Sequence, residues 1–254
     1  MSETVYDGFL ANIYDFCPFF GKYRSLISVD YLSELDGIEK NVILELGTAT
    51  GLLTIPLLES GFYVDTVDYS GDMYRIAKNK VNSLSNQFSK KVNFILADIT
   101  KIKLCKNMYG AVVIPDNLLS VISDACLTNV LQMCYDSLVE GGKVLLDICK
   151  PDDMSKGKKY SDTIRFRDSN RSIYIVRAEH EIDFDKQNHI IFFDYKRRIN
   201  KSEYVEAESF TLVYHYRYVE AVVSILTNVG FSHIKVKENS DNIYFISAQK
   251  NKIK

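Results

Sequence analysis

The sequence predicts a doubly wound α/β fold, a mostly parallel seven-stranded sheet with an inserted antiparallel β-sheet. Three observations predict it. In the first 150 residues, short apolar segments of strand length alternate with helical segments, which is typical of a parallel sheet. Between residues 151 and 216 this pattern gives way to strands with alternating polar and apolar residues, as in an antiparallel sheet. After residue 217, a helix and two strands resume the first pattern.

The parallel part is predicted element by element from apolar runs and turn residues. Strands are expected at Val42–Leu46, Tyr63–Val67, Val92–Leu96, Gly110–Ile114 and Lys143–Cys149. Helices are expected at Gly51–Glu59, from the Ser70 cap to Leu84, and at Ile122–Ser137, with Asp72 near the positive end of the second one. Before the first strand, an aromatic-rich segment from Tyr6 to Phe20 is broken at Pro18, and a second helical piece runs from about Lys22 to Leu35.

The inserted part has four strand-like segments, and the last part of the chain closes the fold. Strands are expected near Thr163–Asp168, Ser172–Asp183, His189–Ile199 and Val205–Tyr216. The closing elements are a helix at Val219–Asn228 that stops at Gly230, and strands at His233–Lys237 and Tyr244–Ala248. The predicted domains are an N-terminal helical lid (1–40), an α/β core (41–150 and 217–250) and an inserted substrate platform (151–216).

Composition excludes several functional classes. The chain has 254 residues, of which 46% are hydrophobic and 25% charged, as in a soluble globular protein. The net charge of −2 and the pI of about 6.1 provide no basic field for nucleic acid. Five cysteines without Cys-x-x-Cys spacing indicate reduced thiols and a cytoplasmic location. The four histidines lack metal-type spacing, and no apolar run approaches the roughly 18 residues that span a membrane.

The segment from Val42 to Gly51 is the most informative. It reads Val-Ile-Leu-Glu-Leu-Gly-Thr-Ala-Thr-Gly, and Asp68 follows at the end of the next strand. Two parallel strands that end in carboxylates and small residues indicate a nucleotide-sized ligand at the carboxyl edge of the sheet. A dinucleotide fingerprint needs Gly-x-Gly-x-x-Gly, whereas here the small residues fall at Gly47, Ala49 and Gly51. The spacing disfavours a pyrophosphate cradle.

This segment resembles motif I of the class I S-adenosylmethionine-dependent methyltransferases, Glu/Asp-x-Gly-x-Gly-x-Gly, with Ala49 in place of the middle glycine. The resemblance extends over nearly the whole chain, favours the small-molecule branch similar to glycine and amino-sugar N-methyltransferases, and implies S-adenosylmethionine as cofactor. It places the loop of Gly47, Thr48, Ala49 and Gly51 beneath the methionine part of the cofactor. Glu45 is expected to orient that loop or reach the amino group, and Asp68 to accept hydrogen bonds from both ribose hydroxyls.

Three further stretches are assigned to the site by the same resemblance. Asp98 and Ile99, after the third strand, match the motif that meets the adenine ring, and Met73 and Tyr69 are expected beside the cofactor. Pro115 and Asn117 follow the fourth strand, where the family places residues that face the methyl group; Pro115 is assigned to the cofactor and Asn117 to the acceptor. The stretch lacks the Asn/Asp-Pro-Pro-Tyr/Phe motif of nucleobase methylases, which argues against DNA as substrate.

The residues that contact the methyl acceptor are predicted from two further resemblances, one in the N-terminal segment and one in the inserted sheet. Tyr14-Asp15 resembles the pair that opens many bacterial small-molecule methyltransferases, so Tyr14 is the expected lid residue, with Tyr6 behind it. An antiparallel platform resembles enzymes that methylate glycine-like substrates or nucleotide-linked amino sugars. Arg177 and Arg217 could hold a carboxylate or phosphate there by bidentate contacts. His180 and His215 are the candidate bases, because imidazole titrates near neutral pH.

The expected function is methyl transfer to a small-molecule acceptor by in-line displacement, at an amine nitrogen rather than an oxygen. O-methylation, methylation of a protein or RNA, and a cofactor-binding protein without activity remain alternatives. A nicotinamide oxidoreductase is disfavoured by the glycine spacing. No nucleic acid, membrane or metal is expected as a partner. The edges of the inserted sheet could pair between subunits, so a homodimer is one expectation.

Overall fold

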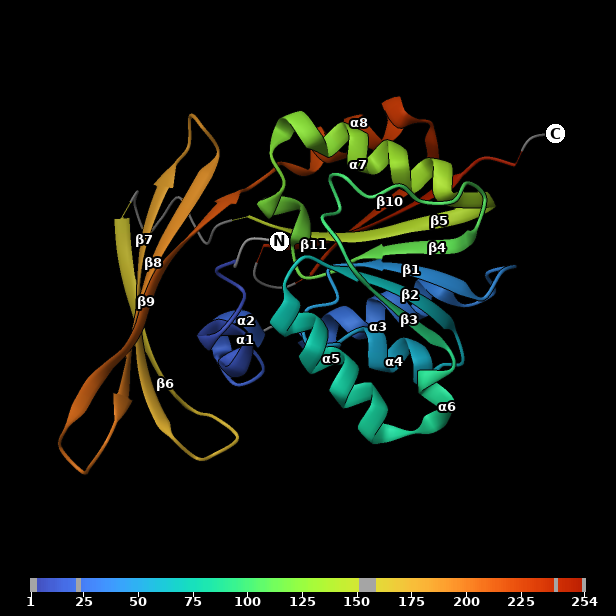
Figure 1. Cartoon of the computed structure of the whole chain (residues 1–254). Coiled ribbons are helices and arrows are strands. Elements are labelled where there is room, and N and C mark those ends of the chain that lie inside the picture. Colours follow the sequence, from blue (N-terminus) through green and yellow to red (C-terminus); the bar gives the residue numbers. More distant parts are fainter. Residues whose placement is uncertain (1–3, 22–23, 151–158, 240–241, 253–254) are drawn as a thin grey trace. The chain divides into compact units, whose positions relative to one another are not determined.

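The computed structural model describes residues 4–21, 24–150, 159–239 and 242–252. The chain divides into two compact units (Figure 1). The first takes its residues from the ranges 1–23 and 151–216, and the second from 24–150 and 217–254. None of the helices in the described ranges is long and apolar enough to span a membrane.

The second unit is built on one seven-stranded sheet in the order β10-β11-β5-β4-β1-β2-β3. Its strands are β1 (Val42–Leu46), β2 (Tyr63–Asp68), β3 (Val92–Leu96), β4 (Tyr109–Ile114), β5 (Leu138–Cys149), β10 (Phe231–Glu238) and β11 (Ile243–Lys250). The first five are parallel, whereas β11 runs antiparallel to both β5 and β10. This arrangement confirms the predicted fold class.

Helices cover both faces of this sheet, as the term doubly wound implies. They are α3 (Arg24–Leu35), α4 (Thr54–Glu59), α5 (Gly71–Leu84), α6 (Asn86–Ser89), α7 (Asp124–Ser137) and α8 (Val219–Val229), with a 3₁₀ turn η1 (Leu118–Val121) after β4. Figure 1 shows α7 and α8 on one face and α3 and α4 on the other. The C-terminal stop of α8 at Gly230, in the left-handed conformation, was predicted.

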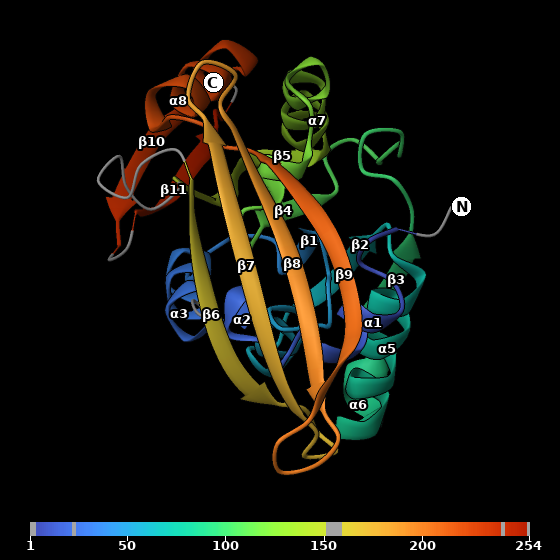
Figure 2. The same ribbon diagram turned by 90° about the vertical axis from the view of Figure 1, so that its left-hand side faces the viewer.

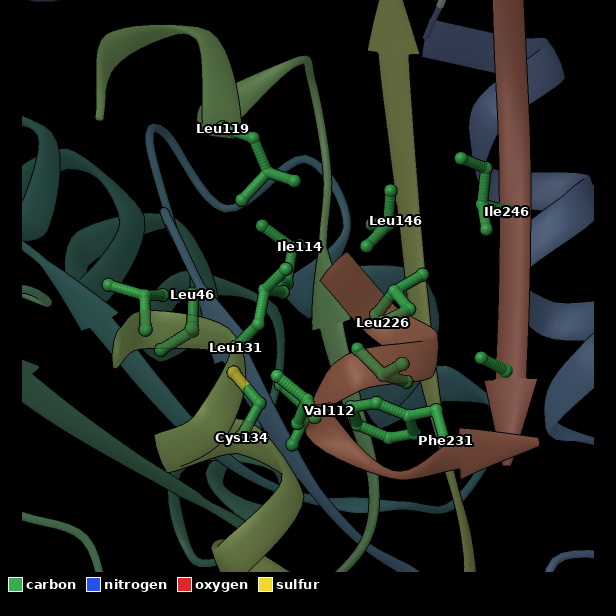
Figure 3. Close-up of a cluster of buried hydrophobic side chains, with 14 of the residues drawn as sticks. Leu46, Val112, Ile114, Leu119, Leu131, Cys134, Leu146, Leu226, Phe231 and Ile246 are labelled. Carbon is green, nitrogen blue, oxygen red and sulfur yellow. The ribbon is translucent and has the colours of Figure 1, made fainter. Parts of the chain in front are cut away.

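Alternation along the central strands supplies both faces with core residues. In β4, Val112 and Ile114 pack toward α7 and α8, while Ala111 and Val113 pack toward α3 and α4. Figure 3 shows the first of these clusters, in which side chains of η1, α7, α8 and the sheet meet: Leu46, Val112, Ile114, Leu119, Leu131, Cys134, Leu146, Leu226, Phe231 and Ile246. Each fully buried aliphatic side chain contributes roughly 1.5–3 kcal/mol, so the strand ends that carry the predicted site are firmly held.

The first unit contains the inserted sheet, with its four strands in chain order (Figure 2). They are β6 (Lys159–Arg167), β7 (Ile173–Asp183), β8 (Asn188–Arg198) and β9 (Tyr204–His215), all antiparallel. Two short helices, α1 (Phe9–Ile13) and α2 (Pro18–Gly21), belong to the same unit. The ring of Phe9 lies 5.2 Å from that of Tyr195, and Phe20 lies 5.5 Å from Phe193. Aromatic contacts therefore join these helices to one face of the inserted sheet.

Most predicted boundaries shift by a few residues, and three of the differences matter for the interpretation of the chain. The helix after β1 begins at Thr54 instead of Gly51, because Gly51 has a φ of 85°. Strand β5 begins at Leu138, so the Gly141-Gly142 pair lies inside a strand and not in a turn. The predicted 1–40 segment is shared between the units, since α1 and α2 belong to the first and α3 to the second.

Candidate active site

The loop after β1 has an unusual backbone. Gly47, Ala49 and Gly51 have φ values of 80°, 46° and 85°, all in the left-handed region. Glycine adopts this region freely, whereas Ala49 does so at a cost of roughly 1–2 kcal/mol. The Gly47 N–H bonds the Val67 carbonyl at 2.8 Å, which ties the loop to β2. The loop therefore turns through positive φ at three positions.

Asp68 joins this loop to the start of α5. Its Oδ2 accepts the Ala49 N–H at 2.7 Å and its Oδ1 accepts the Ser70 N–H at 2.8 Å. The Ser70 hydroxyl in turn accepts the Met73 N–H at 3.1 Å, as predicted for a helix cap. Each carboxylate oxygen can accept a second hydrogen bond. Met73 is buried, whereas Tyr69 beside Asp68 is exposed.

Glu45 lies entirely buried beneath the loop. Its Oε2 accepts the hydroxyls of Thr54 at 2.5 Å and Thr66 at 3.0 Å, and Thr66 also contacts the Thr48 hydroxyl. Within the described part of the chain, Oε1 has no hydrogen-bond partner. Burial raises the pKa of Glu45 to about 8, and the nearby Asp68 adds to the effect, although the threonine hydroxyls oppose it. Glu45 therefore orients the loop through threonines.

Stability without ligand should depend on the protonation of Glu45. A carboxyl whose pKa is higher in the folded state favours folding below its unfolded pKa of 4.5 and loses that contribution as the pH rises toward 8. Burial, followed by the nearby Asp116, likewise raises the pKa of Asp147 to about 7. We expect the melting temperature to fall between pH 5 and 8 and Glu45→Gln to flatten that fall.

Glu39→Gln is the matched control for this measurement. Glu39 is exposed and its pKa is lowered by the Lys252 ammonium, so it stays ionised throughout the window. Thermal unfolding followed by circular dichroism at pH 5, 6, 7 and 8 compares the three proteins. An unchanged slope in Glu45→Gln would contradict this account of the buried carboxyl.

The acid predicted at the adenine end is held by its own turn. Asp98 Oδ1 accepts the Thr100 N–H at 2.9 Å and the Thr100 hydroxyl at 2.7 Å, and Oδ2 lies 2.9 Å from the Lys101 ammonium. Burial alone would raise the pKa of Asp98, but the Thr100 and Lys101 contacts lower it overall. Ile99 packs against the core. The adenine-binding role of both residues stays a prediction.

The loop after β4 is organised by Asp147 and Tyr31, two residues that were not singled out from the sequence. Asp116 and Asn117 both have left-handed backbones, and their N–H groups donate to Asp147 on β5. The Tyr31 hydroxyl, from α3, donates to the same carboxylate at 2.8 Å. Pro115 is buried. The sequence feature that could have identified this site is Asp147 itself, because it is a lone acid in the apolar run from Val144 to Ile148.

Arg217, predicted to hold the substrate, lies buried in the second unit. Its guanidinium donates to the carbonyls of Leu119 and Ile122, both at 2.6 Å, and to Asp124 Oδ1 at 2.9 Å. Burial lowers the pKa of Arg217, although Asp124 opposes the shift. These contacts join η1 to the start of α7, which is a structural role.

The other residues that were predicted to contact the acceptor lie on different faces of the inserted sheet. His180 pairs across the sheet with Ile191, and Asn188 pairs with His215, so alternation puts His180 and His215 on opposite faces. His215 Nδ1 is hydrogen-bonded to Asn188 at 2.8 Å. Arg177 is exposed, on the face opposite His180, and its guanidinium lies 3.0 Å from Glu179. The two candidate bases therefore cannot line one pocket on a single face.

His180 lies in a cluster on the buried face. Its Nδ1 is 2.9 Å from His189 Nε2, its ring stacks on Tyr160 at 4.2 Å, and its Nε2 is 3.8 Å from Asp162. Burial, followed by the proximity of His180, lowers the pKa of His189 to about 4. His189 was not predicted as a site residue, because spacing along one strand does not show a partner on the next.

The two predicted lid tyrosines belong to the first unit. Tyr14 is buried and stacks on Phe20, with ring centroids 5.3 Å apart. Tyr6 lies in the turn before α1, where its N–H donates to the Thr4 hydroxyl at 3.0 Å. Their predicted roles over the cofactor stay predictions.

The comparisons with known proteins agree with this geometry. Residues 43–142 match the family model described as a methyltransferase domain. No curated protein matches the sequence. Among solved structures, the CcbJ methyltransferase from Streptomyces caelestis is 17% identical with a TM-score of 0.77, and the match covers 99% of this chain and 100% of that one.

Two other solved structures have the same fold. CalS10 from Micromonospora echinaspora, described as an amino pentose methyltransferase with bound S-adenosylmethionine, is 13% identical with a TM-score of 0.73 over 98% of this chain and 100% of that one. The glycopeptide N-methyltransferase MtfA is 16% identical with a TM-score of 0.63 over 89% and 86%. Residues 43–142 therefore match a methyltransferase domain, and the described fold is shared with solved structures of S-adenosylmethionine-dependent methyltransferases.

Proposed function

We propose that this enzyme methylates an amine nitrogen of a small polar acceptor, of the amino-sugar class. The observation that carries the proposal is the extent of the fold match. It includes the inserted sheet and the N-terminal helices, since 98% of this chain aligns with an amino pentose methyltransferase. A glycopeptide N-methyltransferase has a similar fold over 89% of the chain. These additions to a methyltransferase domain are suited to holding an acceptor.

The residues at the carboxyl edge of the second unit fit the cofactor. Gly47, Ala49 and Gly51 turn the loop through left-handed conformations that let a ligand approach the backbone. Glu45 offers a buried oxygen that lacks a hydrogen-bond partner among the described residues, and a carboxylate such as that of Asp68 is an acceptor suited to ribose hydroxyls. In this proposal Thr48 belongs to the same loop, Asp68 holds the ribose, and Met73, Asp98 and Ile99 hold the adenine. The further cofactor contacts are Tyr69 and Pro115.

The chain's own residues must orient the acceptor and remove a proton. The bound cofactor supplies a methyl group on a sulfonium cation, and positioning the nucleophile in line contributes several kcal/mol to catalysis. An amine also has to lose a proton. His180 is the candidate for this role on the inserted sheet, where its Nδ1 lies 2.9 Å from His189 Nε2 and its Nε2 3.8 Å from Asp162.

Titration calorimetry with S-adenosylhomocysteine, with NAD as the control, tests the cofactor part. We expect micromolar binding of the thioether and none of NAD. Amines, among them nucleotide-linked amino sugars, are then incubated with S-adenosylmethionine, and the products are located by mass spectrometry and NMR. A methyl group on nitrogen supports the proposal, whereas a methyl group on oxygen, or no transfer to any amine, overturns it.

A further inference from the structure

A single buried carboxylate gathers the loop after β4. Asp147, on β5, is 3% exposed. Its Oδ1 accepts the Tyr31 hydroxyl at 2.8 Å and the Asp116 N–H at 2.9 Å, and its Oδ2 accepts the Asn117 N–H at 2.7 Å. The Tyr31 hydroxyl also lies 2.9 Å from the Ile114 carbonyl at the end of β4. Three donors therefore converge on the two oxygens of one buried side chain.

The turn that these bonds hold is costly to form. Asp116 and Asn117 have φ values of 59° and 55°, and neither is glycine. Each such residue costs roughly 1–2 kcal/mol, and such conformations persist only where the surroundings over-determine them. A second bond from β5 supports the same turn, because the Asn117 Oδ1 accepts the Cys149 N–H at 3.1 Å. Strand β5 therefore imposes the conformation of the β4 loop.

This turn lies at the cofactor edge of the sheet. Strands β1 and β4 are parallel neighbours, so the Gly47 loop and the Asp116 turn leave the sheet at the same edge. The segments that follow these two strands also lie close together, because a Cβ atom added to Gly47 would lie 2.9 Å from Leu118 Cδ2. Displacement of the turn would also move η1, and it would therefore change which side chains lie beside the Gly47 loop.

Stability alone does not account for an acid at this position. Taking a carboxylate out of water costs several kcal/mol, and apolar replacements of buried ionic groups are often neutral or stabilising. The neighbours of Asp147 along the strand, Leu146 and Ile148, are apolar and buried. What an apolar residue could not do is accept two consecutive backbone N–H groups, so the benefit of Asp147 is geometric.

We propose that Asp147, with Tyr31, is a positioning residue that holds the Asp116-Asn117 turn in the shape needed beside the acceptor. The acceptor part of this inference rests on the proposed methyl transfer. Asp147 does not touch the reacting atoms in this account; it acts through the turn.

The test uses Asp147→Asn and Tyr31→Phe in the full chain. The asparagine puts an NH₂ group where one backbone N–H needs an acceptor, so the turn should open more often. We expect amide hydrogen exchange at Asp116 and Asn117, followed by NMR, to accelerate at least tenfold in Asp147→Asn and less in Tyr31→Phe, which keeps both amide bonds. Affinity for S-adenosylhomocysteine should change less than threefold, while kcat/KM for an amine acceptor should fall at least tenfold.

Matched controls come from a similar pair elsewhere on the sheet. The Tyr109 hydroxyl donates to Asp65 Oδ2 at 2.7 Å, so Asp65→Asn and Tyr109→Phe remove a tyrosine–aspartate bond without touching the turn. Unchanged exchange at Asp116 and Asn117 in Asp147→Asn would overturn the proposal, as would faster exchange with unchanged turnover. The exchange and binding measurements need no acceptor, so a failure of the proposed methyl transfer is recognised separately.

Discussion

Asp68→Ala should weaken the binding of S-adenosylhomocysteine by at least about 100-fold. Hydrogen bonds to an ionised group contribute about 1.5–3 kcal/mol each, and the proposed site has two of them to the ribose. The substitution also removes the acceptor of the Ala49 and Ser70 N–H groups. The loop beneath the cofactor would then lose its tie to α5, so the affinity should fall through both effects. Titration calorimetry measures it.

Two variants separate recognition from folding in this experiment. Asp68→Asn keeps the shape and one acceptor oxygen, so an intermediate loss is expected. Asp65→Asn lies three residues earlier on the same strand, where the carboxylate accepts the Tyr109 hydroxyl and not a loop amide; its affinity should stay within threefold. Equal affinity in Asp68→Ala and the unmodified enzyme, with both folded by circular dichroism, would remove Asp68 from the cofactor site.

Arg217→Ala should lower the free energy of unfolding by about 3 kcal/mol. The guanidinium is buried and satisfies the carbonyls of Leu119 and Ile122. Removing it leaves two carbonyls and the first turn of α7 without a charged donor, and each lost bond to a charged group costs about 1.5–3 kcal/mol. Urea denaturation followed by circular dichroism measures the change.

Arg177→Ala is the control for this measurement. Arg177 is exposed and its only described ion pair is with Glu179, and exposed pairs contribute about 0–1 kcal/mol. A substrate role for Arg217 predicts lost turnover with normal stability, whereas the structural role predicts lost stability. Equal denaturation midpoints for Arg217→Ala and Arg177→Ala would exclude the structural role.

The sequence was informative wherever one strand or turn determines its own structure. Strands β1 and β3 begin and end at the predicted residues, because each is a short, mostly apolar run with a polar residue before it and a small residue after it. The cap at Ser70 and the stop at Gly230 follow from local hydrogen bonding and a left-handed backbone. The cofactor edge was also predictable, since parallel strands end on the same side of a sheet.

Features that depend on pairing between distant segments were not predictable. The role of Asp147 depends on the hydrogen bond that it accepts from Tyr31, which is over a hundred residues away in sequence. His180 and His215 look equivalent in sequence, and only the register of β7, β8 and β9 shows that they occupy opposite faces. Gly142 resembles a turn glycine, but it lies in β5 where a Cβ would meet the Val139 carbonyl at 2.9 Å.

The pairing of β5 with β11 has a consequence for synthesis on the ribosome. Cys149 pairs with Ile243, so the core sheet is completed only after the inserted segment has been made. At about 5–20 residues per second, the intervening stretch of roughly 90 residues takes on the order of 5–20 seconds to translate. During that interval β5 has no partner on its outer side, and an unpaired strand edge is prone to aggregation. Newly made chains are therefore most vulnerable while the segment between β5 and β11 is being translated.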